Sequence, residues 1–168
     1  MNTTVSHAPP KREPRLPPRW FMRTFWAAQR ALYTLTGGRF GLRAASPERW
    51  GMMRLRTVGR RTGAERSAIL GYVEDGQNLV TLAANGWADP EPAWWLNLQA
   101  SPDTTVDLPD GPRHVHARAA GPDERPRLWA KWAMYDKDQD VFAARRSRET
   151  QVVILEPLRA PQPGSSGT

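Results

Sequence analysis

A change in the spacing of apolar residues part-way along the chain most constrains what it can fold into. Residues 20–36 carry apolar side chains every three or four positions, which predicts an amphipathic helix. Further on the period becomes two, because Met53, Leu55 and Thr57 alternate with arginines, and this predicts a half-buried strand. The chain therefore changes from a helical to an extended region.

The remaining pattern is dominated by short strands. Turn residues separate the apolar stretches, and prolines precede one short helix. Asp123 is predicted to cap a longer helix whose apolar stripe ends at Tyr135. The other predicted strands are residues 68–74, 79–84, 104–108, 113–119 and 151–156, and the other predicted helices are residues 93–100 and 138–146. Antiparallel strands with helices inserted between them predict a mainly β protein, a barrel with helical cover.

Length and composition predict one folded domain with two polar ends. The chain has 168 residues, and residues 1–18 form a proline-rich leader that we expect to be disordered. Residues 19–157 form the predicted domain, and residues 158–168 are a flexible tail. Cysteine is absent, which excludes disulfides, thiolate metal sites and a cysteine nucleophile.

Location and charge set further bounds. No apolar run approaches the roughly 18 residues of a membrane span, so we expect a cytoplasmic protein. Contact of helix 20–36 with a membrane surface is the alternative. Basic residues outnumber acidic ones by 24 to 17. This excess fits either a clustered anion site or an arginine-rich genome, and no nucleic-acid-binding motif is present, so we expect no nucleic acid partner.

The most informative motif is a basic turn between two strands, residues 57–66. Glycines at both ends allow a tight turn, so Arg60, Arg61, Arg66 and the hydroxyl of Thr62 can converge on one anion. Such a turn suits phosphate or carboxylates. The alternative is an exposed hairpin in an arginine-rich protein.

A second motif runs from a strand through Gly86 into the helix of residues 93–100. A strand that opens through glycine toward a helix N-terminus offers free backbone donors for a phosphate. Trp94 and Asn97 are three residues apart on one helix face, which places an apolar wall beside an amide. The alternative makes Trp94 a core residue and Asn97 a turn partner, and Trp95 is predicted to be core.

Taken in order, these motifs resemble the nitroreductase-like, deazaflavin-dependent oxidoreductases. The matching set is Thr-x-Gly-Arg-Arg-Thr-Gly-x-x-Arg, then Asn-Gly, then Pro-Ala-Trp-Trp-x-Asn-Leu, then Ser-Arg-Glu-x-x-Val-Val-Ile-Leu-Glu-Pro, over roughly residues 21–157. The resemblance implies a split β-barrel of the FMN-binding type. It also implies coenzyme F420, an 8-hydroxy-5-deazaflavin, lying in a groove with its phosphate and acidic tail on the basic turn.

The resemblance assigns coenzyme contacts by position. At four of these positions the chain departs from its relatives, with Ile69, Ala84, Asn85 and Trp87 where they often have proline, serine, lysine and glycine. FMN therefore stays as an alternative coenzyme. The implied coenzyme-binding residues are Arg60, Arg61, Thr62, Gly63, Arg66, Ile69, Leu70, Ala84, Asn85, Gly86, Trp87, Trp94 and Asn97.

The predicted substrate pocket consists of Trp26, Tyr135, Gln139 and Phe142. Tyr135 is a candidate proton donor, although a tyrosine ending an apolar stripe is also typical of packing. His114 and His116 share a strand face but have no third ligand candidate nearby, so no metal is expected.

The implied activity is hydride transfer from the reduced deazaflavin to an electron-poor acceptor such as a quinone, an enone or a nitro compound. The protein is expected to act as a monomer or homodimer on a small-molecule substrate. One alternative is a carrier that binds the same coenzyme without turnover. The other is a basic protein that binds nucleic acid or a membrane surface.

Overall fold

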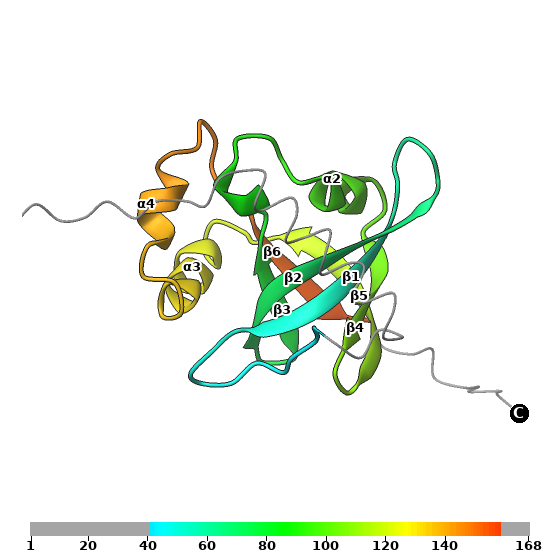
Figure 1. The fold of residues 1–168 in the computed structure, drawn as a ribbon, viewed down its shortest axis with the longest axis horizontal. Coiled ribbons are helices and arrows are strands. Elements are labelled where there is room, and N and C mark those ends of the chain that lie inside the picture. The colour runs from blue at the N-terminus through cyan, green and yellow to red at the C-terminus, as the bar shows by residue number, and fades with distance from the viewer. Residues whose placement is uncertain (1–40, 159–168) are drawn as a thin grey trace, which may run out of the picture.

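Six antiparallel strands close into a barrel. We describe a computed structural model, in which residues 41–158 are placed (Figure 1). The strand order around the barrel is β1-β2-β3-β6-β5-β4, and every neighbouring pair is antiparallel. The strands are β1 (Gly51–Val58), β2 (Glu65–Asp75), β3 (Asn78–Leu82), β4 (Asp103–Leu108), β5 (Gly111–Ala119) and β6 (Val152–Pro157). The predicted mainly β, split-barrel fold is confirmed.

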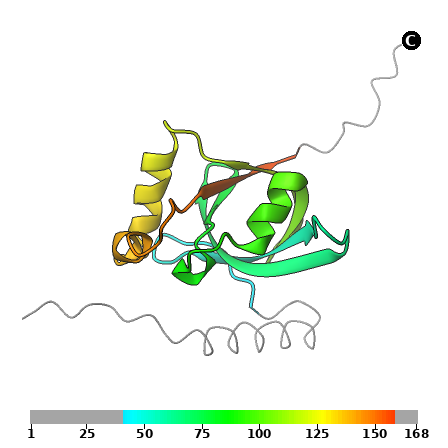
Figure 2. The ribbon, with the colours of Figure 1, turned by 90° about the horizontal axis from the view of Figure 1, so that it is seen from above.

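Helical segments cover the barrel at two separate places. One 3₁₀ turn and one helix follow β3, and two helices lie between β5 and β6. The helices α2 and α3 stay apart in two perpendicular views (Figures 1 and 2). The segments are η1 (Asn85–Trp87), α2 (Ala93–Ala100), α3 (Arg125–Ala133) and α4 (Gln139–Ala143).

The barrel has one apolar core inside and a second on its outer face. Met53 and Leu55 are completely buried in the inner core, as the alternation of β1 predicts, and Trp95 and Leu98 of α2 pack there too. The outer core lies between the strands and α3, where Leu128 is buried. This core burial is the main stabilising contribution to the fold.

Strand β6 shows why one strand can be continuously apolar. Val153 and Leu155 belong to the inner core, whereas Val152 and Ile154 pack in the outer core with α3. All four are buried because both faces of the strand are covered. The expectation of a fully buried strand is confirmed.

Most predicted boundaries differ from the structure by one to three residues, and α2 agrees at both ends. Strand β2 begins earlier than expected, since Glu65 and Arg66 still pair with the end of β1. Strand β3 ends at Leu82, and the predicted residues 83–84 lead into η1 instead.

The start of α3 corrects the sequence prediction. Glu124, not Asp123, is the N-cap, and no side chain caps the helix. Pro126, in the first turn of the helix, suits a position where a missing backbone donor is tolerated. The carboxylate of Glu124 instead accepts hydrogen bonds from Arg118 and from the N–H of Gly121. Helix α3 also ends before Tyr135.

Other predictions are shortened or fall outside the placed residues. Helix α4 spans five residues rather than residues 138–146. The predicted leader 1–18, the helix over 20–36 and the tail beyond Leu158 lie outside the described residues. Within residues 41–158, none of the helices has the length and apolar character needed to cross a membrane.

Candidate functional site

The basic turn is tightly closed by main-chain hydrogen bonds. The N–H of Gly59 donates to the carbonyl of Ala64 at 2.8 Å, and that of Gly63 donates to the carbonyl of Gly59 at 2.7 Å. Gly63 has a φ of +67°, which glycine adopts without strain. Arg60, Arg61 and Arg66 are exposed, and within residues 41–158 no carboxylate forms an ion pair with any of them.

Asn97 fastens this turn to α2. Its Oδ1 accepts from the N–H of Arg60 at 3.2 Å, and its Nδ2 donates to the hydroxyl of Thr57 at 3.1 Å. Asn97 is only 5% exposed, so the amide lies behind the turn. The structure thus brings Asn97 to the basic turn, where it positions the backbone of Arg60, which agrees with the alternative of Asn97 as a turn partner.

The loop after β3 has the geometry of an anion-binding nest. Ala84 is right-handed, with φ −82° and ψ −20°, and Asn85 is left-handed, with φ +49°. In such a pair successive N–H groups converge on one concave side. Among the hydrogen bonds of the described residues, none uses the N–H of Ala84, Asn85 or Gly86. Three donors are therefore available to an anion.

The left-handed conformation continues through the next two residues. Gly86 and Trp87 have φ values of +61° and +63°. Asparagine and glycine tolerate this region, whereas a tryptophan rarely adopts it. The Nδ2 of Asn85 donates to the carbonyl of Pro90 at 2.8 Å, which helps to hold the turn.

Arg146 binds the same loop from its buried side. Its guanidinium donates to three loop carbonyls and one hydroxyl, and the residue is 7% exposed. These contacts are Ala88 O at 3.0 Å, Ala83 O at 3.2 Å, Asp89 O at 3.4 Å and Thr150 Oγ1 at 2.6 Å. Sequence reasoning missed Arg146, because nothing in its local pattern distinguishes it from the neighbouring arginines.

Asp89 is held by the segment that follows Arg146. Its Oδ1 accepts from the N–H of Ser147 at 2.6 Å, and this hydrogen bond lowers the pKa of Asp89 below its ordinary value. The loop is therefore joined to residues 146–147 both through its carbonyls and through this carboxylate.

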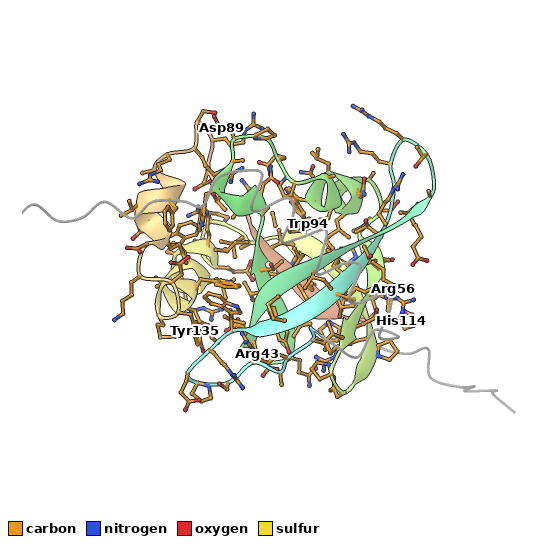
Figure 3. All side chains as sticks on the ribbon, viewed as in Figure 1. Arg43, Arg56, Asp89, Trp94, His114 and Tyr135 are labelled. Carbon is orange, nitrogen blue, oxygen red and sulfur yellow. The ribbon has the colours of Figure 1, made fainter. Side chains whose placement is uncertain are left out.

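Aromatic side chains lie beside the nest. The Trp87 ring stacks on Phe142 with centroids 6.0 Å apart. Trp94 is half-buried against the inner core, and Trp95 is fully in that core, as predicted. In Figure 1 α2 lies between the basic turn and η1, and Figure 3 shows Trp94 on the barrel side of α2. The two motifs therefore flank the same helix.

The other predicted pocket residues are less closely gathered. Gln139 is 1% exposed and its Nε2 donates to the carbonyl of Trp129 at 3.2 Å. The hydroxyl of Tyr135 donates to the carbonyl of Ser46 at 3.2 Å, and Figure 3 shows Tyr135 well away from Asp89. Trp26 lies outside the described residues.

The remaining predicted positions lie in β2 or lack the chemistry of a ligand set. Ile69 is buried and Leu70 is half-buried. His116 Nδ1 lies 2.6 Å from Asp103 Oδ1, and His114 Nδ1 lies 3.1 Å from Thr105 Oγ1. In the part of the chain that the structure describes, no three potential ligands from His, Cys, Asp and Glu come together.

Comparison with known proteins gives consistent matches. The family described as F420H(2)-dependent quinone reductase matches residues 22–157. The F420H(2)-dependent quinone reductase Rv1261c of Mycobacterium tuberculosis (strain ATCC 25618 / H37Rv) is 30% identical over 133 residues, which cover 74% of this chain and 85% of that protein.

Two solved structures have a similar fold. An F420-H2 dependent reductase (FDR-A) aligns with a TM-score of 0.57 and 24% identity, over 62% of this chain and 93% of its own. A protein described as a domain-swapped dimer aligns with a TM-score of 0.59 and 22% identity, over 80% of this chain and 99% of its own.

Proposed function

Because this chain belongs to the F420H(2)-dependent quinone reductase family, it is an oxidoreductase whose coenzyme is F420, and we propose where that coenzyme is held. The basic turn binds its acidic tail, and the nest of Ala84, Asn85 and Gly86 binds its phosphate. The observation that carries the proposal is the set of three N–H groups without an acceptor in the described residues. They are the donors that an anion needs.

The residues present fit an anionic coenzyme. Guanidinium groups recognise carboxylate and phosphate oxygens through pairs of hydrogen bonds, and three of them project from one turn. The indole of Trp94, a half-buried residue of α2, supplies an apolar surface. The basic turn also favours F420 over FMN as the coenzyme, because only F420 carries an acidic tail that these arginines can bind.

When bound, the reduced coenzyme supplies a hydride, and the protein's part is to orient the reactants and to exclude water. The hydrogen bonds of Asn97 fix the backbone of Arg60, and the stack of Trp87 on Phe142 gives an apolar wall beside the nest. We propose this wall as the contact surface for a planar quinone. Enones and nitro compounds, which are also electron-poor, are further proposed acceptors.

We also propose that the protein forms a homodimer. The support is the structure of similar fold that is described as a domain-swapped dimer. Light scattering coupled to size-exclusion chromatography tests this directly. A mass of two chains is expected, and a mass near 18.9 kDa at micromolar concentration would contradict it.

The site assignment is tested by a pair of left-handed glycines. Gly86 lies in the nest with φ +61°, and Gly76 lies in the distant β2–β3 turn with φ +63°. Valine at either position is strained by similar amounts, about 1–3 kcal/mol. Only Gly86→Val should weaken F420 binding, by about tenfold, measured by quenching of tryptophan fluorescence.

Gly76→Val is the matched control for a general loss of stability. Thermal unfolding of both variants should show comparable losses, while the F420 affinity of Gly76→Val stays within twofold of wild type. Unchanged F420 binding by a folded Gly86→Val variant would place the phosphate elsewhere.

A further inference from the structure

We propose that Arg146 supplies the fixed positive charge of the phosphate site without touching the coenzyme. It lies behind the loop of residues 83–89, turns the peptide groups of that loop outward and attracts the phosphate through the loop. This makes Arg146 a positioning residue. The inference rests on the proposed function, since it assumes that the nest holds the phosphate.

The first support is that Arg146 is a buried cation without a carboxylate partner. All four of its hydrogen bonds go to uncharged oxygens, three of them main-chain carbonyls. Within residues 41–158, no acidic group comes within ion-pair distance of its guanidinium. The exposed carboxylate of Asp89 attracts Arg146 from beyond that distance. A buried charge is costly unless it is paired, so the charge of Arg146 is compensated only in part and an anion can relieve the rest.

The second support is the direction of the peptide groups. No cis peptide bond occurs in the described residues, so each carbonyl points opposite to the N–H of the next residue. Because Arg146 binds the carbonyls of Ala83 and Ala88, the N–H groups of Ala84 and Asp89 point away from it. Neither of these N–H groups has an acceptor within the described residues.

The third support is the charge of the loop itself. Residues 83–89 contain no cationic side chain, and Asn85 stands at a position that is often lysine in the family this chain resembles. Arg145 and Arg148 are exposed, so water and salt screen their charges. The carboxylate of Asp89 keeps its negative charge, although its Oδ1 accepts from the N–H of Ser147 on the side of the loop that faces residues 146–147. The buried charge of Arg146 is therefore the least screened cation next to the nest.

Thermodynamic linkage gives the consequence. If the phosphate relieves the deficit around Arg146, then removing the charge must weaken binding of the phosphate and leave binding of the more distant ring largely unaffected. An arginine that only holds the loop in shape would act through its hydrogen bonds, so a variant that keeps the charge and one that removes it would lose affinity to the same extent.

The test uses the full-length protein, three variants and two probes. Arg146→Lys keeps the charge with fewer hydrogen bonds, and Arg146→Gln removes the charge while retaining polar atoms. Arg148→Gln removes the same charge from an exposed position of the same segment. The probes are F420 and the deazaflavin that lacks the phosphate and acidic tail, titrated against tryptophan fluorescence at low and physiological salt.

We expect Arg146→Gln to weaken F420 binding by about tenfold, with less than a twofold change for the phosphate-free probe. Arg146→Lys should retain most of the preference for F420, and Arg148→Gln should stay within twofold of wild type. Hydrogen exchange at residues 84–89, measured without coenzyme, should be similar in the Lys and Gln variants.

Other outcomes separate the two proposals. Equal losses in the Lys and Gln variants, equal losses for both probes, or failure of both variants to fold would make Arg146 purely structural and overturn the inference. A wild-type protein that binds the two probes equally would instead overturn the proposed function, because the phosphate and tail would then contribute nothing.

Discussion

Arginines on the α3 side of the barrel and arginines in the basic turn have opposite surroundings. Arg118 lies between two carboxylates, with Nη1 2.6 Å from Glu124 Oε2 and Nε 2.8 Å from Glu156 Oε1. Arg127 binds Asp75 through both Nη atoms, at 2.7 and 2.8 Å. Arg60 and Arg61 have no such partner in the described residues. Arginine therefore forms ion pairs with carboxylates in one region of the described chain and forms none in the other.

This difference teaches how to interpret the basic composition. The charge excess says little by itself, since arginines of β1, β5 and α3 are already neutralised by Asp107, Glu156 and Asp75. The informative arginines are those without a carboxylate partner. Among the described residues, those of the basic turn lie on one side of α2, and the nest lies on the other side (Figure 1). That arrangement favours a compact anionic ligand over an extended nucleic acid.

The largest effect is expected from variants of the basic turn. Replacing Arg60 and Arg61 together by alanine should weaken F420 binding by about two to four decades, since each charge-assisted contact contributes about 1.5–3 kcal/mol. The free energy of unfolding should change by less than about 0.5 kcal/mol, because exposed charges contribute little to stability. Fluorescence titration and urea unfolding measure the two quantities.

Arg49→Ala is the control, as an exposed arginine outside both motifs. It should leave both quantities unchanged. A double variant that folds and binds F420 like wild type would remove the basic turn from the site.

The opposite behaviour is expected on the α3 side. Arg118→Met should lower the free energy of unfolding by no more than about 1 kcal/mol, the range of partly exposed ion pairs, because Glu124 and Glu156 lose a shared partner and repel each other. Affinity for F420 should remain within twofold, since this pair lies away from α2. If Arg118→Met weakened coenzyme binding as strongly as the turn variants do, the division into two regions would be wrong.

The smallest effect is the pH dependence of the α3 side. The hydrogen bond from Arg127 lowers the pKa of Asp75 from 3.8 to about 2. A carboxylate with a lowered folded-state pKa stabilises the protein above its unfolded pKa, and this contribution is lost as the pH falls from about 4 toward 2. Its size is on the order of 1 kcal/mol, as for partly exposed pairs.

Asp75→Asn should flatten this part of the stability curve, measured by urea unfolding between pH 2 and 5. Glu124, whose pKa is also lowered to about 2 by the hydrogen bond from Arg118, should keep a residual slope in that variant. If the free energy of unfolding of Asp75→Asn had the same pH dependence as that of wild type, the ion pair of Asp75 and Arg127 would contribute nothing to stability.

Local patterns predicted the barrel well. Three elements formed close to where they were predicted, because each has a signal within a few neighbouring residues. These signals are the alternation around Met53 and Leu55 for β1, the prolines before Ala93 for α2 and the apolar run of β6. The start of α3 was missed by one residue, because Glu124 rather than Asp123 is the N-cap and its carboxylate accepts hydrogen bonds from Arg118.

The site could be predicted only in part. The basic turn and the glycine of the nest have local signals, but Arg146 contacts loop residues that lie 57 to 63 positions away. No periodicity or spacing in the sequence predicts a contact between residues so far apart. The buried hydrogen bonds of Asn97 likewise depend on the packing of α2 against β1, so the sequence placed this amide on the same helix face as Trp94 without indicating which groups it binds.

The central claim is that the coenzyme's anionic part lies across the nest and the basic turn. It is tested most directly by following the backbone N–H resonances of ¹⁵N-labelled protein during titration with F420. We expect large shifts for Ala84, Asn85, Gly86 and Arg61, and none for residues 118–127 of the α3 side. Shifts confined to the α3 side, or an unperturbed nest at saturating F420, would contradict the account.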